Sequence, residues 1–118
     1  MNEVFFRFDD LKKRVAHLRD MIDSRAEVKI PFLGKAKKGL TDVLDEDYDH
    51  DSPESSINWA KRAMWRVDRA KVALFRAQCL FGGELPQTIN AHQCAANMVK
   101  KIGIRIKRAE NNLTKRKK

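Results

Sequence analysis

The sequence predicts an all-α protein, a small bundle of three long helices and one short helix built on a long antiparallel helical hairpin. Two observations predict this class. Apolar residues recur at helical spacing, and five glycines and three prolines in 118 residues leave long stretches without a helix breaker. With 42% hydrophobic and 35% charged residues, residues 1–118 have the composition of one globular domain that buries a real core.

The first predicted helix carries an apolar stripe along one face. Its members follow the spacing i, i+4, i+7, i+11, i+14 and i+18: Val4, Phe8, Leu11, Val15, Leu18 and Ile22. Asn2 is the expected N-cap. Acid-before-base pairs such as Glu3–Arg7 and Asp9–Lys13 support the outer face by about 0.2–0.5 kcal/mol each. Balanced charges of this kind indicate a structural helix.

The next stretch contains two glycines and a proline. The segment "VKIPFLGKAKKG", which ends at Gly39, therefore predicts a connection across the surface. A short helix of about two turns is expected from Leu40 to Tyr48, within an acidic connector at about 41–52. The connector resembles a calcium loop at its start, but His50 and Ser56 stand where that loop needs glycine and glutamate. Either the connector is a solvated acidic segment, or it folds back on the basic helix and competes with phosphate.

The second half of the chain predicts the hairpin, at about 53–81 and 86–115. Pro53 suits a first helical position, and Gly82-Gly83 suits a C-cap, so the first helix would be roughly 43 Å long. The stripe of the last helix is Ala91, Ala95, Met98, Ile102, Ile106 (or Arg105), Ala109 and Leu113. The first helix of the chain cannot cover all of this hairpin. We therefore expect a homodimer, unless that helix and the short one suffice.

The positive charge is concentrated on the hairpin. Residues 53–118 hold 15 Lys/Arg against 4 Asp/Glu, whereas residues 39–52 hold 6 acids and no base; the whole chain carries +9. This distribution favours an acidic partner, nucleic acid first and an acidic protein surface second. No window approaches the roughly 18 apolar residues of a membrane span, so no membrane partner is expected.

Arginines follow one side of the first hairpin helix, in "WAKRAMWRVDRAKVALFRAQ". On a helical wheel they lie opposite the core face, and Asp68 is the only acid beyond the first turn. Because guanidinium forks onto phosphate, and because the last helix and the tail 115–118 are also basic, we predict phosphate contacts on both helices. The predicted contacts are Arg62, Arg66, Arg69, Arg76, Lys101, Arg105, Arg108, Lys115 and Arg116.

The leading functional hypothesis is a small accessory nucleic-acid-binding protein, DNA or RNA, that contacts the phosphate backbone and is therefore salt-sensitive. No zinc-finger spacing, basic-region zipper or RNP-like strand supplies a sequence-reading motif. Trp65 and Val72 form a second apolar seam. Either the first or the last helix packs against this seam, or it is a protein contact or a platform on which bases stack. Trp59 is expected in the core. The alternatives are a helical adaptor or inhibitor that docks on another protein, a self-assembling structural protein, or a basic face that only meets solvent.

No pattern indicates catalysis, so we expect neither an enzyme nor a cofactor. The chain has no Gly-rich phosphate loop and no serine elbow, and its three histidines are scattered without metal-ligand spacing. Two cysteines, Cys79 and Cys94, are too few for a disulfide framework, and the register of the hairpin disfavours a bond between them. These features favour the cytoplasm, or the nucleus if the host is a eukaryote.

Overall fold

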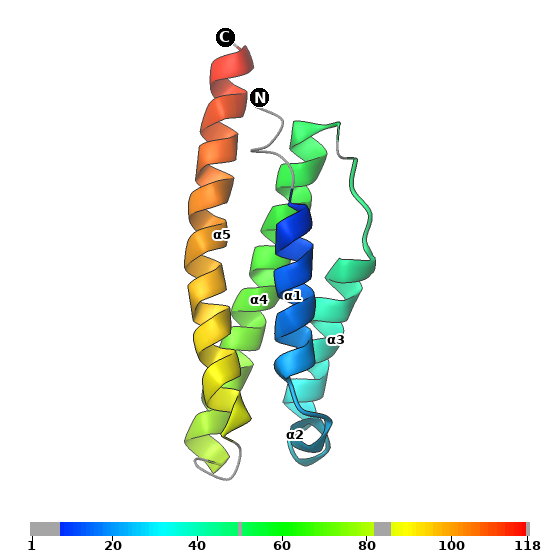
Figure 1. Ribbon diagram of the computed structural model, residues 1–118, viewed down its shortest axis with the longest axis vertical. Coiled ribbons are helices and arrows are strands. Elements are labelled where there is room, and N and C mark those ends of the chain that lie inside the picture. Colours follow the sequence, from blue (N-terminus) through cyan, green and yellow to red (C-terminus); the bar gives the residue numbers. More distant parts are fainter. Residues whose placement is uncertain (1–7, 50, 82–85, 118) are drawn as a thin grey trace.

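The computed structural model describes residues 8–49, 51–81 and 86–117, with side chains as far as Lys115. These residues form five helices and confirm the all-α prediction. The helices are α1 (Asp9–Met21), α2 (Ser24–Lys29), α3 (Pro31–Asp45), α4 (Pro53–Phe81) and α5 (Gln87–Lys117). Helix α4 packs against α5, α3 and α1, whereas α3 and α5 do not touch each other. The bundle measures 53 × 23 × 17 Å, with its helices along the long axis (Figure 1).

Helix α1 begins later than the sequence suggested. Its N-cap is Phe8, whereas the expected N-cap, Asn2, and the first residue of the stripe, Val4, lie outside the described residues. Two acids occupy the first turn, where they complement the helix dipole. The described members of the apolar stripe, from Phe8 to Ile22, are all buried and confirm the predicted core face.

The prediction of a surface connection before Leu40 is wrong. Residues 31–45 form α3, which starts with Pro31 in its first turn and continues through Gly34 and Gly39. The glycines are tolerated because α3 packs against α1, α2 and α4, and packing outweighs the roughly 1 kcal/mol that each glycine costs in a helix. The bundle therefore has four helices of 13 or more residues and the short α2, where the sequence predicted three long helices and a short one.

The long hairpin is confirmed. Helix α4 starts at Pro53, where the Ser52 hydroxyl accepts a hydrogen bond from the Ser55 amide at 3.2 Å. The expected turn "GGELP" falls mainly on residues 82–85, outside the described residues. On α5, Ile106 rather than Arg105 continues the buried stripe. Over the described residues, no helix combines the length and the apolar character needed to cross a membrane.

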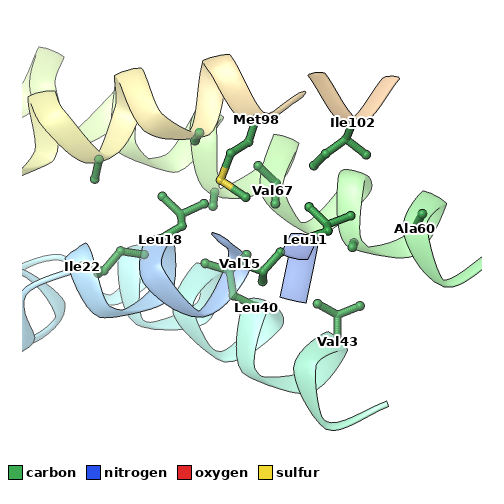
Figure 2. Packing of buried hydrophobic residues seen from close by; sticks show 14 of the residues in the cluster. Leu11, Val15, Leu18, Ile22, Leu40, Val43, Ala60, Val67, Met98 and Ile102 are labelled. Atoms are coloured by element: carbon green, nitrogen blue, oxygen red, sulfur yellow. The ribbon is translucent and has the colours of Figure 1, made fainter. Parts of the chain in front are cut away.

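The core lies between α1 and α4, with α3 and α5 on its flanks (Figure 2). Leucine, valine and isoleucine come from α1, α3 and α5, while α4 contributes many small side chains that allow close helix packing. The buried alanines of α4 are Ala60, Ala63, Ala70, Ala73 and Ala77. The apolar stripe of the hairpin is thus covered largely within one chain. The homodimer stays a prediction.

Two aromatic side chains, Tyr48 and Trp59, attach the acidic connector to the bundle. Trp59 is fully buried, as predicted, and its Nε1 donates to the Val43 carbonyl at 3.0 Å. The Tyr48 ring stacks on Trp59 with centroids 5.1 Å apart. The Tyr48 hydroxyl accepts from the Phe8 amide at 3.1 Å and donates to Asp9 at 3.2 Å. Tyr48 therefore attaches the connector to the start of α1, while Asp47, Asp49 and Asp51 are exposed.

Candidate nucleic-acid interface

A groove of about 570 Å³ runs along the molecule between α3 and α4. Arginines of α4 form one wall, and a lysine and a phenylalanine of α3 stand opposite. The side chains that carry chemistry in this groove are Phe32, Lys35, Trp65, Arg66, Arg69 and Arg76. We call it the basic groove. It gathers three of the four arginines that the sequence singled out on this helix.

Each of these arginines rests on an aromatic ring. The guanidinium carbons of Arg66 and Arg69 both lie 4.9 Å from the centroid of Trp65. The guanidinium of Arg76 lies 4.7 Å from the centroid of Phe32, which belongs to α3. Such contacts stabilise by about 0.5–1 kcal/mol when exposed, and they restrict the arginine side chains. These weak contacts therefore favour positions of the three arginines beside the rings that line the groove before any ligand arrives.

A guanidinium that lies over a ring can keep its hydrogen-bonding capacity. A guanidinium contacts a ring through its planar face, whereas its five N–H donors point outward in that plane. Among the described residues, no carboxylate lies within ion-pair distance of Arg66, Arg69 or Arg76. The one acid that lines the groove, Asp68, pairs with Lys71 at 3.2 Å. The basic groove thus carries a positive excess that can bind an anion through forked hydrogen bonds.

Arg62, the fourth predicted arginine, is engaged elsewhere. Its Nε lies 2.7 Å from a carboxylate oxygen of Glu46, in the acidic connector, and it does not line the basic groove. The hypothesis that the acidic connector folds back on the basic helix requires contacts of this kind. Among the described residues, the connector forms an ion pair with one of the four arginines. Because both side chains are substantially exposed, the pair contributes about 0–1 kcal/mol to stability. Competition with phosphate at Arg62 stays a prediction.

The basic residues of α5 lie on a different face. Arg105 makes two hydrogen bonds to Asp10 of α1, at 2.8 and 3.2 Å, and its guanidinium lies over the ring of Phe8. Lys101, Arg108 and Lys115 follow the same side of α5 by helical spacing, and all three are exposed. The side chain of Arg116 lies outside the described residues. Since the basic groove opens between α3 and α4, the two predicted sets do not form one surface.

Trp65 stands between two grooves. The residue is 51% exposed, so the interpretation that another helix packs over Trp65 is wrong for the described chain. Beyond Trp65 lies a second groove of about 760 Å³, between α4 and α5. We call this the apolar groove; Met64, Val99 and Ile104 contribute to its walls, and several lysines form its rim. Val72, also 51% exposed, lines the basic groove instead.

Sequence reasoning missed the α3 side of the basic groove. Phe32, Lys35, Ala36 and Gly39 stand at i, i+3, i+4 and i+7, which is the spacing of one helical face. Interpreting Pro31 as a first helical residue rather than as a breaker would have revealed this face. Gly39 matters most, because an added Cβ there would lie 3.3 Å from Cδ of Arg66. The missing side chain leaves room for Arg66 to cross α3.

The cysteines and histidines form no site in the described part of the chain, where no group of three His, Cys, Asp or Glu side chains could hold a metal ion. Cys79 and Cys94 are both free thiols. Burial raises the pKa of the Cys94 thiol, and the positive charge of Arg14 acts against that rise. Neither cysteine faces the basic groove.

The chain was compared with protein-family models, with curated proteins and with solved structures, and no match was found.

Proposed function

We propose that this protein is a small accessory nucleic-acid-binding protein, and that the basic groove is its phosphate-binding site. One observation carries the proposal: three arginines that lie over aromatic rings converge with a lysine of the opposite wall between α3 and α4, and no carboxylate of the described chain forms an ion pair with the arginines. A face that served solubility alone would mix both signs of charge. The net charge of +9 adds long-range attraction to a polyanion.

The exposed cations of α5 have a secondary role in this proposal. Lys101, Arg108 and Lys115 attract a polyanion without defining its position, because they lie over no aromatic ring of the described residues and follow the side of α5 that turns toward α1. Their effect depends on charge alone and should be screened within about 10 Å at moderate salt. This difference between the two faces supplies a matched control.

The test is a salt titration of binding to labelled single-stranded DNA, double-stranded DNA and RNA, followed by fluorescence anisotropy. The logarithm of the affinity should fall linearly with the logarithm of salt concentration, with a slope of about −2 to −3 for the three or four cations of the basic groove on a single strand. A variant with Arg66→Glu, Arg69→Glu and Arg76→Glu should lose at least about tenfold more affinity than the control, because it also loses forked hydrogen bonds.

The control carries Lys101→Glu, Arg108→Glu and Lys115→Glu, which changes the net charge by the same amount on the other face. Circular dichroism should show the same helix content in both variants and in the natural protein. Equal losses in the two variants would mean that no discrete site exists. If the natural protein bound none of the three nucleic acids at low salt, the proposed function would be excluded.

The second candidate is the adaptor or inhibitor that docks on another protein. The apolar groove favours it, because Ile104 is 54% exposed beside the half-exposed Trp65, and lysines on the rim would suit an acidic partner. The same titration separates the candidates. Docking through apolar side chains tolerates salt, whereas binding through phosphate contacts does not.

A further inference from the structure

We infer that the basic groove takes single-stranded nucleic acid and that Trp65 stacks on one of its bases. This inference rests on the proposed function and specifies its ligand. Three features of the groove lead to it: the exposed ring of Trp65, the arrangement of the arginines around that ring, and the position of α4 within the bundle.

The ring of Trp65 can stack only on a base whose face is accessible. In a duplex the bases stack on one another, and a protein in either groove meets their edges. In a single strand the faces are open, and stacking on an aromatic side chain is a sequence-tolerant source of affinity. Trp65 is half-exposed at the edge of the basic groove, whereas Trp59 is fully buried in the core. Of the two tryptophans, Trp65 is the one that a base can reach.

The arginines can hold the backbone while a base stacks nearby. From Arg66 to Arg76 the axial rise along α4 is about 15 Å, which matches about four nucleotides at the stacked rise of about 3.4 Å per strand. Lys35 adds a cation from the opposite wall. When a phosphate draws Arg66 or Arg69 outward, the guanidinium leaves the Trp65 ring, and that face becomes free for a base. The groove thus exchanges an internal cation–π contact for a phosphate contact and a stacked base.

The position of α4 disfavours duplex recognition by this face. A helix that reads the major groove must protrude far enough to enter it. Helix α4 instead lies between α3 and α5, with α1 across the core, so only its outer edge is open (Figure 1). Its cations face into a recess of about 570 Å³, a volume typical of sites that hold small groups such as bases. A single strand can enter this recess, whereas a duplex can only lie across it.

The experiment compares three DNA probes of equal length: oligothymidine, an abasic strand with the same phosphates, and a duplex. The natural protein should bind oligothymidine about tenfold more tightly than the abasic strand, because base stacking on an aromatic side chain supplies an increment of this size. Trp65→Ala should remove this difference between the two strands. The abasic probe matters because Trp65→Ala also releases two arginines, and that effect is common to both strands.

Phe75→Ala is the matched control, since Phe75 is a 53% exposed aromatic residue of α4 that does not line the basic groove. It should behave like the natural protein. Oligothymidine should also quench the tryptophan fluorescence, and Trp65→Phe should abolish the quenching because Trp59 is out of reach. Salt-sensitive binding with equal affinity for all three probes, unaffected by Trp65→Ala, would overturn this inference and leave the proposed function standing. Absence of binding to every probe would remove both.

Discussion

At the scale of single residues, the site depends on arginines, because a guanidinium can contact a ring with its planar face and a phosphate with the N–H donors at its edge. The guanidinium groups of Arg66, Arg69 and Arg76 lie over aromatic rings, and the edges of a guanidinium carry the donors that a phosphate needs. A lysine at these positions would keep the charge but lose both the stacking and the fork. The choice of arginine is therefore consistent with positioned anion binding rather than with charge alone.

Tyr48 leads to a prediction about alkaline pH. Burial raises the pKa of Tyr48 above its ordinary value of 10.0, the negative charges of Asp9 and Asp10 raise it further, and the hydrogen bond from the Phe8 amide lowers it in part. A folded pKa above the unfolded one means that the stabilisation is complete below pH 10.0 and is lost as the pH rises through the folded pKa. Since the chain has one tyrosine, tyrosinate absorbance reports this group directly. The midpoint should be higher in native protein than in urea.

Tyr48→Phe supplies the control for this prediction. It should lower the free energy of unfolding by about 1 kcal/mol at neutral pH, because two hydrogen bonds are lost while the ring stacking on Trp59 remains. It should also make the stability less dependent on pH above 10.0. Coincident midpoints for native and unfolded protein would show that Tyr48 is solvated in solution.

At the scale of the elements, α3 shows how a helix can form from a segment whose composition suggests a loop. Gly34 and Gly39 both lie inside it, but their surroundings differ. A Cβ on Gly34 would meet the nearest atom at 3.9 Å, an ordinary contact, whereas a Cβ on Gly39 would meet Arg66 at 3.3 Å. Gly39 is buried at the crossing of α3 and α4, so its lack of a side chain has a packing function.

These two glycines give a paired prediction. Gly34→Ala should raise the free energy of unfolding by about 0.5–1 kcal/mol, because alanine loses less backbone entropy in a helix. Gly39→Ala should gain less, since Arg66 must move by a few tenths of an ångström, and only this variant should weaken oligonucleotide binding. Urea denaturation and anisotropy measure the two effects. If both variants were stabilised equally and bound oligonucleotide like the natural protein, Arg66 would move away from the new methyl group with no loss of stability or affinity.

At the scale of the whole molecule, the uneven charge distribution has opposite consequences for stability and for binding. A net charge of +9 on 118 residues produces self-repulsion in the folded state, and the ion pairs of the described chain are partly exposed and individually weak. Added salt should therefore weaken the repulsion between like charges more than it weakens the ion pairs.

We predict that raising the salt concentration from about 10 to about 200 mM increases the free energy of unfolding by on the order of 1 kcal/mol while it weakens nucleic-acid binding. Urea denaturation, followed by far-ultraviolet circular dichroism, measures the first effect without adding charge. A fall in stability with salt would show that pairs such as Arg105–Asp10 dominate the electrostatics of the fold. The anisotropy titration measures the second effect under the same conditions.

Helical periodicity and composition by themselves determined the all-α class, the long hairpin, the buried stripes of α1 and α5, and the arginines of α4. These are local properties, because spacing along one helix fixes which side chains share a face. Tertiary structure decided the rest. Packing against three neighbours made α3 a helix despite its glycines, aligned Phe32 and Lys35 with the α4 arginines, and paired Arg62 and Arg105 with acids far away in the sequence. Contacts between helices depend on which faces meet in space, and no spacing within a single helix specifies that.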